Sequence, residues 1–305
     1  MMKLTMWYSM KIVSLLLVSL VSPVWAQNPE EAGFEDLTLT IAAAKPQFLP
    51  LEPLTLEIVV RNNTDYPIKG HFGLCLYCER LELYRGRAGE PRTKIPELSG
   101  VIVLQTLPEK VLQPGENFRE RILFEFDLHE NFPEPGPYTL HAVLYDRKKE
   151  TSIESKPVTI IIREPQGIDR LALKHLEDLY NGQAEKFWMG GTLEQDEEFM
   201  LLFQDTTYAP YVAETLFSFY SSRNPEKAIE YLEFMAGRSD YPWADKALGD
   251  LFDLHQRLGH KAQLDQIVDR LKHEYPHSPY TRPFLDDEKT LNEYLNTLRS
   301  RMKKP

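Results

Sequence analysis

The chain has 305 residues, of which 42% are apolar and 27% charged, and its acidic residues outnumber lysine and arginine by 46 to 35. This length accommodates about two domains, each with its own core. The net charge of −11 argues against a protein that binds nucleic acid, because such surfaces need clustered lysine and arginine.

The first segment has the pattern of a targeting sequence. Lys11 precedes an apolar stretch over residues 12–21, and Val24–Ala26 follows with small or apolar residues suited to signal peptidase. The apolar stretch is short for a membrane span. We therefore expect a signal peptide over residues 1–26, cleaved to leave a secreted, periplasmic or extracellular protein without a stable membrane span. The alternative is an uncleaved signal anchor.

After a linker over residues 27–36, residues 37–164 read as β-structure. Leucine, isoleucine and valine alternate with polar residues over positions 54–60, and the same period of two recurs up to residue 162. Turn sequences such as QPGEN (113–117) and PEPGP (133–137) separate the runs. Short strands with such turns, and no helical pattern between them, predict an antiparallel β-sandwich.

Three segments of this region resemble the immunoglobulin-like domains of exported bacterial proteins: LEPLTLEIVVRNNTDYPI, VLQPGENFRERILFEF and GPYTLHAVLYD. The resemblance implies an Ig-like sandwich in which Tyr138 is the tyrosine-corner residue, with its hydroxyl tied to the preceding loop. It leaves the function open, because many activities use this fold. Some relatives act as proteinase inhibitors, and many are spacers.

The two cysteines of the chain, Cys75 and Cys78, form a C-x-x-C within the β region. The apolar positions are even-numbered before them and odd-numbered after them, which predicts a bend that brings their Cα atoms within disulfide range. We expect a structural disulfide, as export and an even count suggest. The alternatives are two unbonded thiols, a redox site, or a zinc site with His71, His129 or His141.

Beyond residue 164 the apolar spacing changes to three and four, which predicts α-helices over residues 165–305. Thr192 and Gln195 have the spacing of a capping box. Asn224 precedes Pro225 as an expected N-cap, and Gly259 is an expected helix stop.

Residue pairs in the helical region recur 34 positions apart. Lys227-Ala228 returns as Lys261-Ala262, and Tyr241-Pro242 returns as Tyr275-Pro276. This is the period of tetratricopeptide repeats, and EYPHSPY (274–280) resembles the linker between such repeats in bacterial envelope proteins. The resemblance implies a TPR-like α-helical solenoid of two to three repeats.

The chain carries no G-x-S-x-G, H-E-x-x-H or glycine-rich phosphate motif. We therefore expect no enzyme, no catalytic or metal-binding residues and no cofactor. The expected function is binding of a protein or peptide partner, or scaffolding of a cell-envelope assembly, through the concave surface of the helical repeats. The alternative is a protease inhibitor or accessory module that acts through the sandwich loops. Aromatic residues at the helix junctions are the candidate partner surface: Tyr208, Tyr211, Trp243 and Tyr280.

Overall fold

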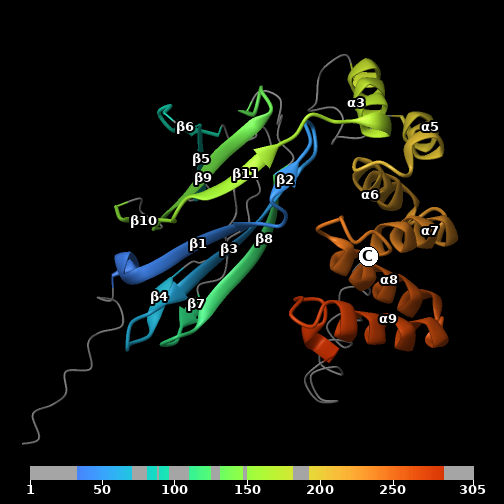
Figure 1. Ribbon diagram of the computed structural model, residues 1–305. Helices are drawn as coiled ribbons and strands as arrows, with labels where there is room; N and C mark the ends of the chain where they lie inside the picture. Colours follow the sequence, from blue (N-terminus) through green and yellow to red (C-terminus); the bar gives the residue numbers. More distant parts are fainter. Residues whose placement is uncertain are drawn as a thin grey trace, which may run out of the picture.

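The structure is a computed structural model that describes residues 33–70, 81–87, 89–95, 110–124, 131–146, 150–180 and 192–284. Strands occupy the N-terminal part of the chain and helices the C-terminal part, and the two parts lie side by side (Figure 1). A β region followed by an α region was expected from the change of apolar period.

The strands are β1 (Leu37–Ala43), β2 (Gln47–Phe48), β3 (Leu54–Asn62), β4 (Ile68–Gly70), β5 (Leu81–Gly86), β6 (Thr93–Lys94), β7 (Lys110–Leu112), β8 (Asn117–Phe124), β9 (Gly136–Tyr145), β10 (Ser152–Glu154) and β11 (Val158–Ile162). The α-helices are α3 (Gly167–Tyr180), α5 (Leu193–Phe203), α6 (Ala209–Tyr220), α7 (Pro225–Ala236), α8 (Ala244–Leu258) and α9 (Lys261–Glu274). Two 3₁₀ turns are η1 (Phe34–Asp36) and η3 (Arg282–Phe284).

The described strands form three sheets. A three-stranded sheet has the order β1-β3-β8, a six-stranded sheet has the order β2-β11-β9-β5-β6 with β10 beside β9, and β4 pairs with β7. All of these pairs are antiparallel except β2 with β11, which is parallel. The six-stranded sheet is therefore mixed.

The two larger sheets share one apolar core. Leu56 and Ile58 of β3 meet Leu83 of β5 and Leu140 of β9 there, and all four are buried. These positions follow the period of two that the sequence displays, because alternate side chains of a strand face the same side. The Tyr138 hydroxyl donates to the Glu134 carbonyl at 2.8 Å, as expected for this residue.

The predicted antiparallel Ig-like β-sandwich is wrong, and so is the resemblance on which it rested. Ile161 and Ile162 of β11 pair in parallel with Gln47 and Phe48, and β4 and β7 stand apart as a separate two-stranded sheet. The physical reason is that alternation reveals which side chains face a core. It does not reveal which strands become neighbours or in which direction they run.

The helices begin and end at the capping residues that the sequence predicts. Thr192 and Gln195 form a reciprocal capping box at the start of α5. The Asn224 side chain accepts a hydrogen bond from the Lys227 N–H at the start of α7, and Gly259 ends α8 with φ 79°, a left-handed conformation that favours glycine. These three predictions are confirmed.

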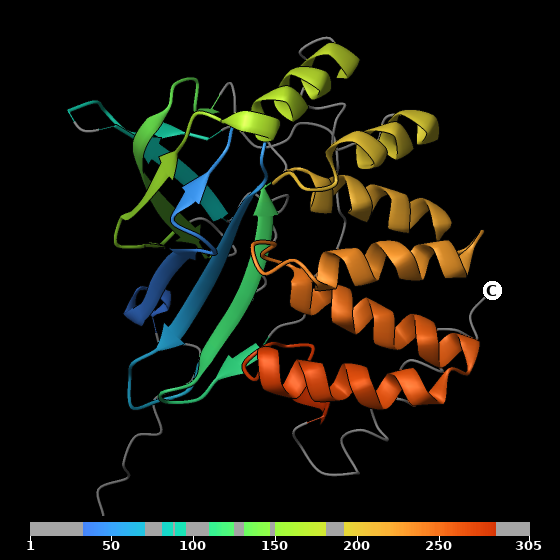
Figure 2. The same cartoon turned by 45° about the vertical axis from the view of Figure 1, so that its right-hand side comes forward.

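The helices stack in sequence order beside the three-stranded sheet, with β8 the strand that lies against them (Figure 2). Leu123 of β8 packs on the core that α6–α9 enclose. A second core joins α3, α5 and α6 to Leu49 and Leu51, which lie between β2 and β3. The helical layer and the β region therefore share buried surface.

The predicted TPR-like α-helical solenoid is also wrong. The described helices do not keep the 34-residue period, because α6 and α8 begin at residues 209 and 244, and α7 and α9 begin at residues 225 and 261. Lys227 is the third residue of α7, whereas Lys261 is the first residue of α9. The residue pairs that recur thus occupy different helical positions. The core shared with Leu49 and Leu51 likewise differs from a free-standing array of helix pairs.

Candidate functional site

Two of the aromatic residues predicted as a partner surface bind the β region of the same chain. The buried Tyr208 donates its hydroxyl to the Pro50 carbonyl at 2.8 Å. The buried Tyr211 donates to Glu52 Oε1 at 3.1 Å. Both tyrosines lie in α6 or at its N-cap and face the segment that leads into β3.

Glu52 is the polar centre of this junction and is fully buried. Its carboxylate also accepts the Leu49 N–H at 3.0 Å and forms an ion pair with Lys45. Burial raises the pKa of Glu52, while Lys45 and the hydrogen bonds from Leu49 and Tyr211 act in the opposite direction. These donors satisfy the buried carboxylate, so Glu52 stabilises the contact between α6 and the β region.

The other two predicted aromatic residues lie at the same helix–sheet boundary or near it. Trp243 donates its indole N–H to Thr55 Oγ1 of β3 at 3.0 Å and is half-buried. The Tyr280 ring packs so closely over Gly249 of α8 that a Cβ there would lie 2.8 Å from a ring carbon. The structure therefore places all four aromatic residues in internal packing.

The cysteine prediction lies outside the described residues. Cys75 and Cys78 are the chain's two cysteines, so the described part contains no disulfide and gives that prediction no support. His71 and His129 also lie outside it, and His141 sits in β9 with Nδ1 3.5 Å from Glu154 Oε1. Among the described residues, no group of three or more His, Cys, Asp or Glu side chains could hold a metal ion.

The signal peptide predicted over residues 1–26 likewise lies outside the described residues. In the part of the chain that the structure describes, none of the helices has the length and apolar character needed to cross a membrane.

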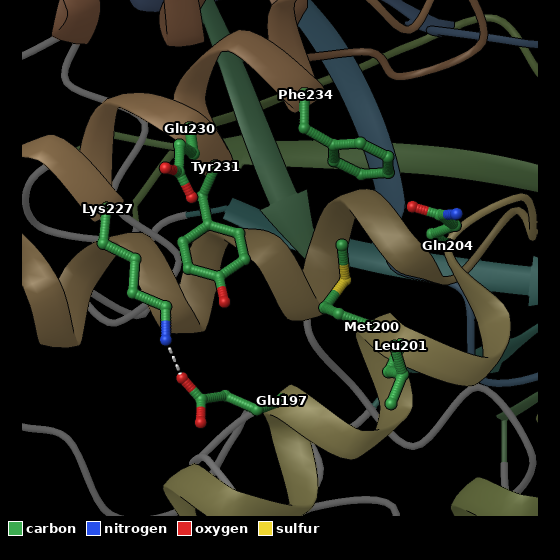
Figure 3. Close-up of a pocket in the computed structure, with 8 residues that line it drawn as sticks. All are labelled: Glu197, Met200, Leu201, Gln204, Lys227, Glu230, Tyr231 and Phe234. Atoms are coloured by element: carbon green, nitrogen blue, oxygen red, sulfur yellow. Dashed lines mark hydrogen bonds and ion pairs between the residues drawn. The ribbon is translucent and has the colours of Figure 1, made fainter.

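A pocket of about 440 Å³ lies between α5 and α7 (Figure 3). Each helix lines it with residues spaced at i, i+3, i+4 and i+7, which is the spacing of one helix face. Gln204, the C-cap of α5, completes the series on that helix. The lining residues are Glu197, Met200, Leu201 and Gln204 on one side and Lys227, Glu230, Tyr231 and Phe234 on the other.

The middle of this α5–α7 groove is apolar and open to solvent. Leu201 is 80% exposed, and the adjacent Leu202 is 50% exposed. Met200, Tyr231 and Phe234 are half-buried and pack against the helical cores. An exposed leucine beside such side chains costs hydrophobic free energy that a bound apolar group would recover.

One end of the groove is closed by an ion pair supported by a tyrosine from α6. Lys227 pairs with Glu197, the Tyr220 hydroxyl donates to Glu197 Oε1 at 2.5 Å, and Lys227 Nζ lies 3.0 Å from the same hydroxyl. Lys227 and Tyr220 lower the pKa of Glu197, and Glu197 with Tyr220 raises that of Lys227. Both groups therefore stay charged near neutral pH. Such groups are suited to binding and poorly suited to general acid–base catalysis, which needs a pKa near the working pH.

Charged side chains of both signs border the groove, since Arg238 donates to the Gln204 carbonyl at 3.2 Å and lies 5.9 Å from the Phe234 ring. The two helices carry Lys227 as their one basic residue, and Lys227 is already paired with Glu197. Glu230 lines the groove and is exposed. The other glutamates of the two helices are Glu194, Glu198, Glu226 and Glu233.

Sequence reasoning missed this groove, although the sequence contains a signal for it. α5 ends in Phe199-Met200-Leu201-Leu202-Phe203, five successive apolar residues. One helix face spans little more than a quarter of the circumference, so such a run leaves some residues facing outward. Phe199 is buried and Leu201 is exposed, as this geometry requires.

No protein-family model and no curated protein matches the chain. Some solved structures show slight likenesses. One is a β-glucosidase from Listeria innocua, 12% identical with a TM-score of 0.26, for which the alignment covers 44% of this chain and 17% of that chain. Another is the sporulation control protein Spo0M from Bacillus subtilis, 13% identical with a TM-score of 0.27, covering 47% and 56%. A β-glucosidase from Erythrobacter marinus, EmGH1, is 14% identical with a TM-score of 0.25, covering 42% and 15%. The chain thus spans less than two thirds of each of these proteins.

Proposed function

We propose that this protein is a non-enzymatic binding protein that holds a basic, amphipathic segment of another polypeptide in the α5–α7 groove. The observation that carries the proposal is Leu201, an 80% exposed leucine that lines a pocket of about 440 Å³. Leucine with this exposure is common on surfaces when isolated, but here it adjoins a hollow with an apolar floor. The pattern at the N-terminus supports action after export, in the periplasm or outside the cell.

The groove fits a helical ligand that carries its own apolar stripe. Helix-in-groove recognition uses apolar anchors at i, i+3, i+4 and i+7, and both walls of this groove repeat that spacing. An apolar anchor would contact Met200, Leu201 and Phe234. Figure 3 shows Lys227 and Glu197 joined across the groove at one end and Gln204 and Phe234 at the other, where Arg238 donates to the Gln204 carbonyl at 3.2 Å.

Charge selects the ligand. Of the glutamates of α5 and α7, Glu197 and Glu230 line the groove, Glu197 is paired with Lys227, and the whole chain has a net charge of −11. Lysine or arginine on the ligand would face Glu230, whereas acidic side chains would be repelled. Surface pairs of this kind contribute only about 0.2–1 kcal/mol each, so we expect the apolar anchor to supply most of the affinity and the charges to supply specificity.

A pair of synthetic helical peptides tests the proposal. Both carry leucine at i, i+3, i+4 and i+7; one carries lysine on its polar face and the other glutamate. We expect the lysine peptide to bind and the glutamate peptide to bind more weakly. Leu201→Ser should weaken binding of the lysine peptide by roughly tenfold, about 1.4 kcal/mol.

Leu171→Ser is the matched control, because Leu171 is 57% exposed on α3 and does not line the groove. It should leave binding unchanged. Equal affinity of the Leu201→Ser variant and the wild type for the lysine peptide would refute the groove as the binding site. A loss of binding shared equally by the Leu171→Ser variant would also refute it.

A further inference from the structure

The sequence beyond α9 contains a segment of the kind that the α5–α7 groove fits. We call residues 291–305 the C-terminal tail; the structure describes the chain as far as Phe284. The apolar residues of the tail are spaced at i, i+3, i+4, i+7 and i+11 and are Leu291, Tyr294, Leu295, Leu298 and Met302. On a helix they share one face, about 100° wide. Both walls of the groove repeat the same spacing.

The tail also has the charge that the groove selects. The whole chain has a net charge of −11, whereas the tail carries four basic residues and one acidic residue, Glu293. On a helix, Arg299 and Arg301 would lie about 80° to either side of the apolar stripe. Each arginine would then face one wall of the groove, where Glu198 of α5 and Glu230 of α7 are exposed.

The residues that link the tail to the described part of the chain are numerous enough to bring it to the groove. The centroid of the Phe284 ring lies 4.8 Å from that of Phe252 in α8. α8 packs against α7, the helix that forms one wall of the groove (Figure 2). The axes of neighbouring helices lie about 8–10 Å apart. Residues 285–290 can extend over about 20 Å, or two such spacings, so the tail can reach the α7 wall.

We propose that residues 291–302 occupy the α5–α7 groove of their own chain and are displaced by the basic segment of the partner. This inference rests on the proposed function, because it assigns a competitor to the same groove. The apolar stripe of the tail would cover Leu201, which is 80% exposed, and would recover hydrophobic free energy that the open groove forgoes. The protein without a partner would therefore be closed to weak ligands.

Attachment to the same chain makes the tail an effective competitor. A short linker holds a segment near its site at an effective concentration of about 1 mM. A dissociation constant of about 0.1–0.3 mM for the isolated segment would then keep the groove mostly filled. A free peptide would consequently bind roughly three- to tenfold more weakly than it binds an open groove. The tail of a second copy would match this only at millimolar protein concentration.

Substitutions in the tail of the full chain test the competition. The double variant Leu295→Ser, Leu298→Ser removes the centre of the apolar stripe. It should bind the synthetic lysine peptide roughly three- to tenfold more tightly than the wild type does. The matched control is Asn296→Ser, Ser300→Asn, because these positions face away from the stripe on a helix. The control should leave the affinity unchanged. Fluorescence anisotropy of the labelled peptide measures all three proteins.

Hydrogen exchange tests the occupancy without any peptide. In the wild type, amides of residues 291–302 should exchange more slowly than in the Leu201→Ser variant, because the variant weakens the groove. Leu171→Ser should retain the protection, since Leu171 lies outside the groove. The protection should not change with protein concentration, as an intramolecular contact requires. This measurement also decides the question if the double variant of the tail fails to fold.

The tail proposal and the proposed function can fail separately. A folded double variant of the tail that binds the lysine peptide no more tightly than the wild type would overturn the tail proposal alone. Equal exchange of residues 291–302 in the wild type and the Leu201→Ser variant would do the same, as would protection that grows with protein concentration. Leu201→Ser weakens the tail and the peptide together, so its full effect on the peptide appears when it is added to the double variant. No loss of peptide affinity there would refute the groove itself.

Discussion

Arg121 of β8 and Asp245 of α8 form a two-pronged contact between the sheet and the helices, with N–O distances of 2.7 and 2.9 Å. Asp245 is buried and also accepts the Ser278 hydroxyl at 2.7 Å, and the Arg121 guanidinium lies 5.0 Å from the Trp243 ring. These residues are remote in sequence, so the contact fixes how the helical layer sits on the β region.

Removing one partner of this contact should cost more than removing both. Arg121→Leu leaves the Asp245 carboxylate buried and unpaired, and we expect it to lower the free energy of unfolding by about 2–3 kcal/mol. Urea denaturation measures this value. The double variant Arg121→Leu, Asp245→Leu should recover part of the loss. Arg119→Leu is the control, because its ion pair with Glu57 is exposed and should contribute less than about 1 kcal/mol. A double variant with a free energy of unfolding equal to or lower than that of the Arg121→Leu variant would contradict this account.

The two faces of α5 predict opposite responses to truncation. Leu201→Ser should change the free energy of unfolding by less than about 0.5 kcal/mol, since the side chain is 80% exposed. Phe199→Ala should cost about 3–5 kcal/mol, because the buried ring packs with Phe203 and leaves a cavity. Thermal or urea unfolding separates these outcomes. A large loss of the free energy of unfolding in the Leu201→Ser variant would show that Leu201 is buried, and would contradict the exposed groove between α5 and α7.

Folding stability should fall between neutral pH and pH 5 because of a histidine pair. His255 Nδ1 lies 3.0 Å from His260 Nδ1 at the junction of α8 and α9. Burial, and secondarily the neighbouring His260, lowers the pKa of His255, while Glu233 and Glu226 oppose the shift. Below its ordinary pKa of about 6.5, the unfolded state takes up the proton before the folded state does, so acidification favours unfolding.

His255→Gln should reduce this dependence, which amounts to at most about 1.4 kcal/mol per pH unit for one proton. Urea midpoints measured from pH 7.5 to pH 5 test the expectation. His273→Gln is the control, because His273 is exposed on α9. An unchanged slope in the His255→Gln variant would assign the effect to other groups.

Leu49 should stabilise the helices although it belongs to the β region. It is buried in the same apolar core as Tyr208 and Val212, which it shares with α3, α5 and α6. Leu49→Ala should cost about 2–5 kcal/mol and should speed hydrogen exchange in α5 and α6 along with β3. Exchange that accelerated only in the strands would contradict a shared core.

Local rules predicted several features of the fold correctly. The capping box at Thr192, the Asn224 cap and the left-handed Gly259 are each determined by a few adjacent residues. The change from a period of two to a period near 3.6 placed the strands before the helices. Such signals need no knowledge of distant parts of the chain.

Long-range relations were predicted poorly. The parallel pairing of β2 with β11 depends on segments more than a hundred residues apart, and alternation carries no record of it. Tyr208 and Tyr211 illustrate the same limit of sequence-based prediction. The sequence pattern around an aromatic residue at a helix junction is the same whether its side chain contacts a partner protein or its own chain. Their hydrogen bonds to Pro50 and Glu52 emerge only in the folded structure.

The contact between Tyr208 and Pro50 also constrains the order in which the protein can form. The two residues are separated by 158 positions, and Trp243 and Thr55 by 188. Contacts between such distant residues slow folding, because a long loop must close before they form. During synthesis the N-terminal strands emerge well before the helices that cover Leu49 and Leu51. We therefore expect a long-lived folding intermediate in which this apolar surface is exposed. Chaperones would have to protect the intermediate from aggregation until the last third of the chain has been synthesised.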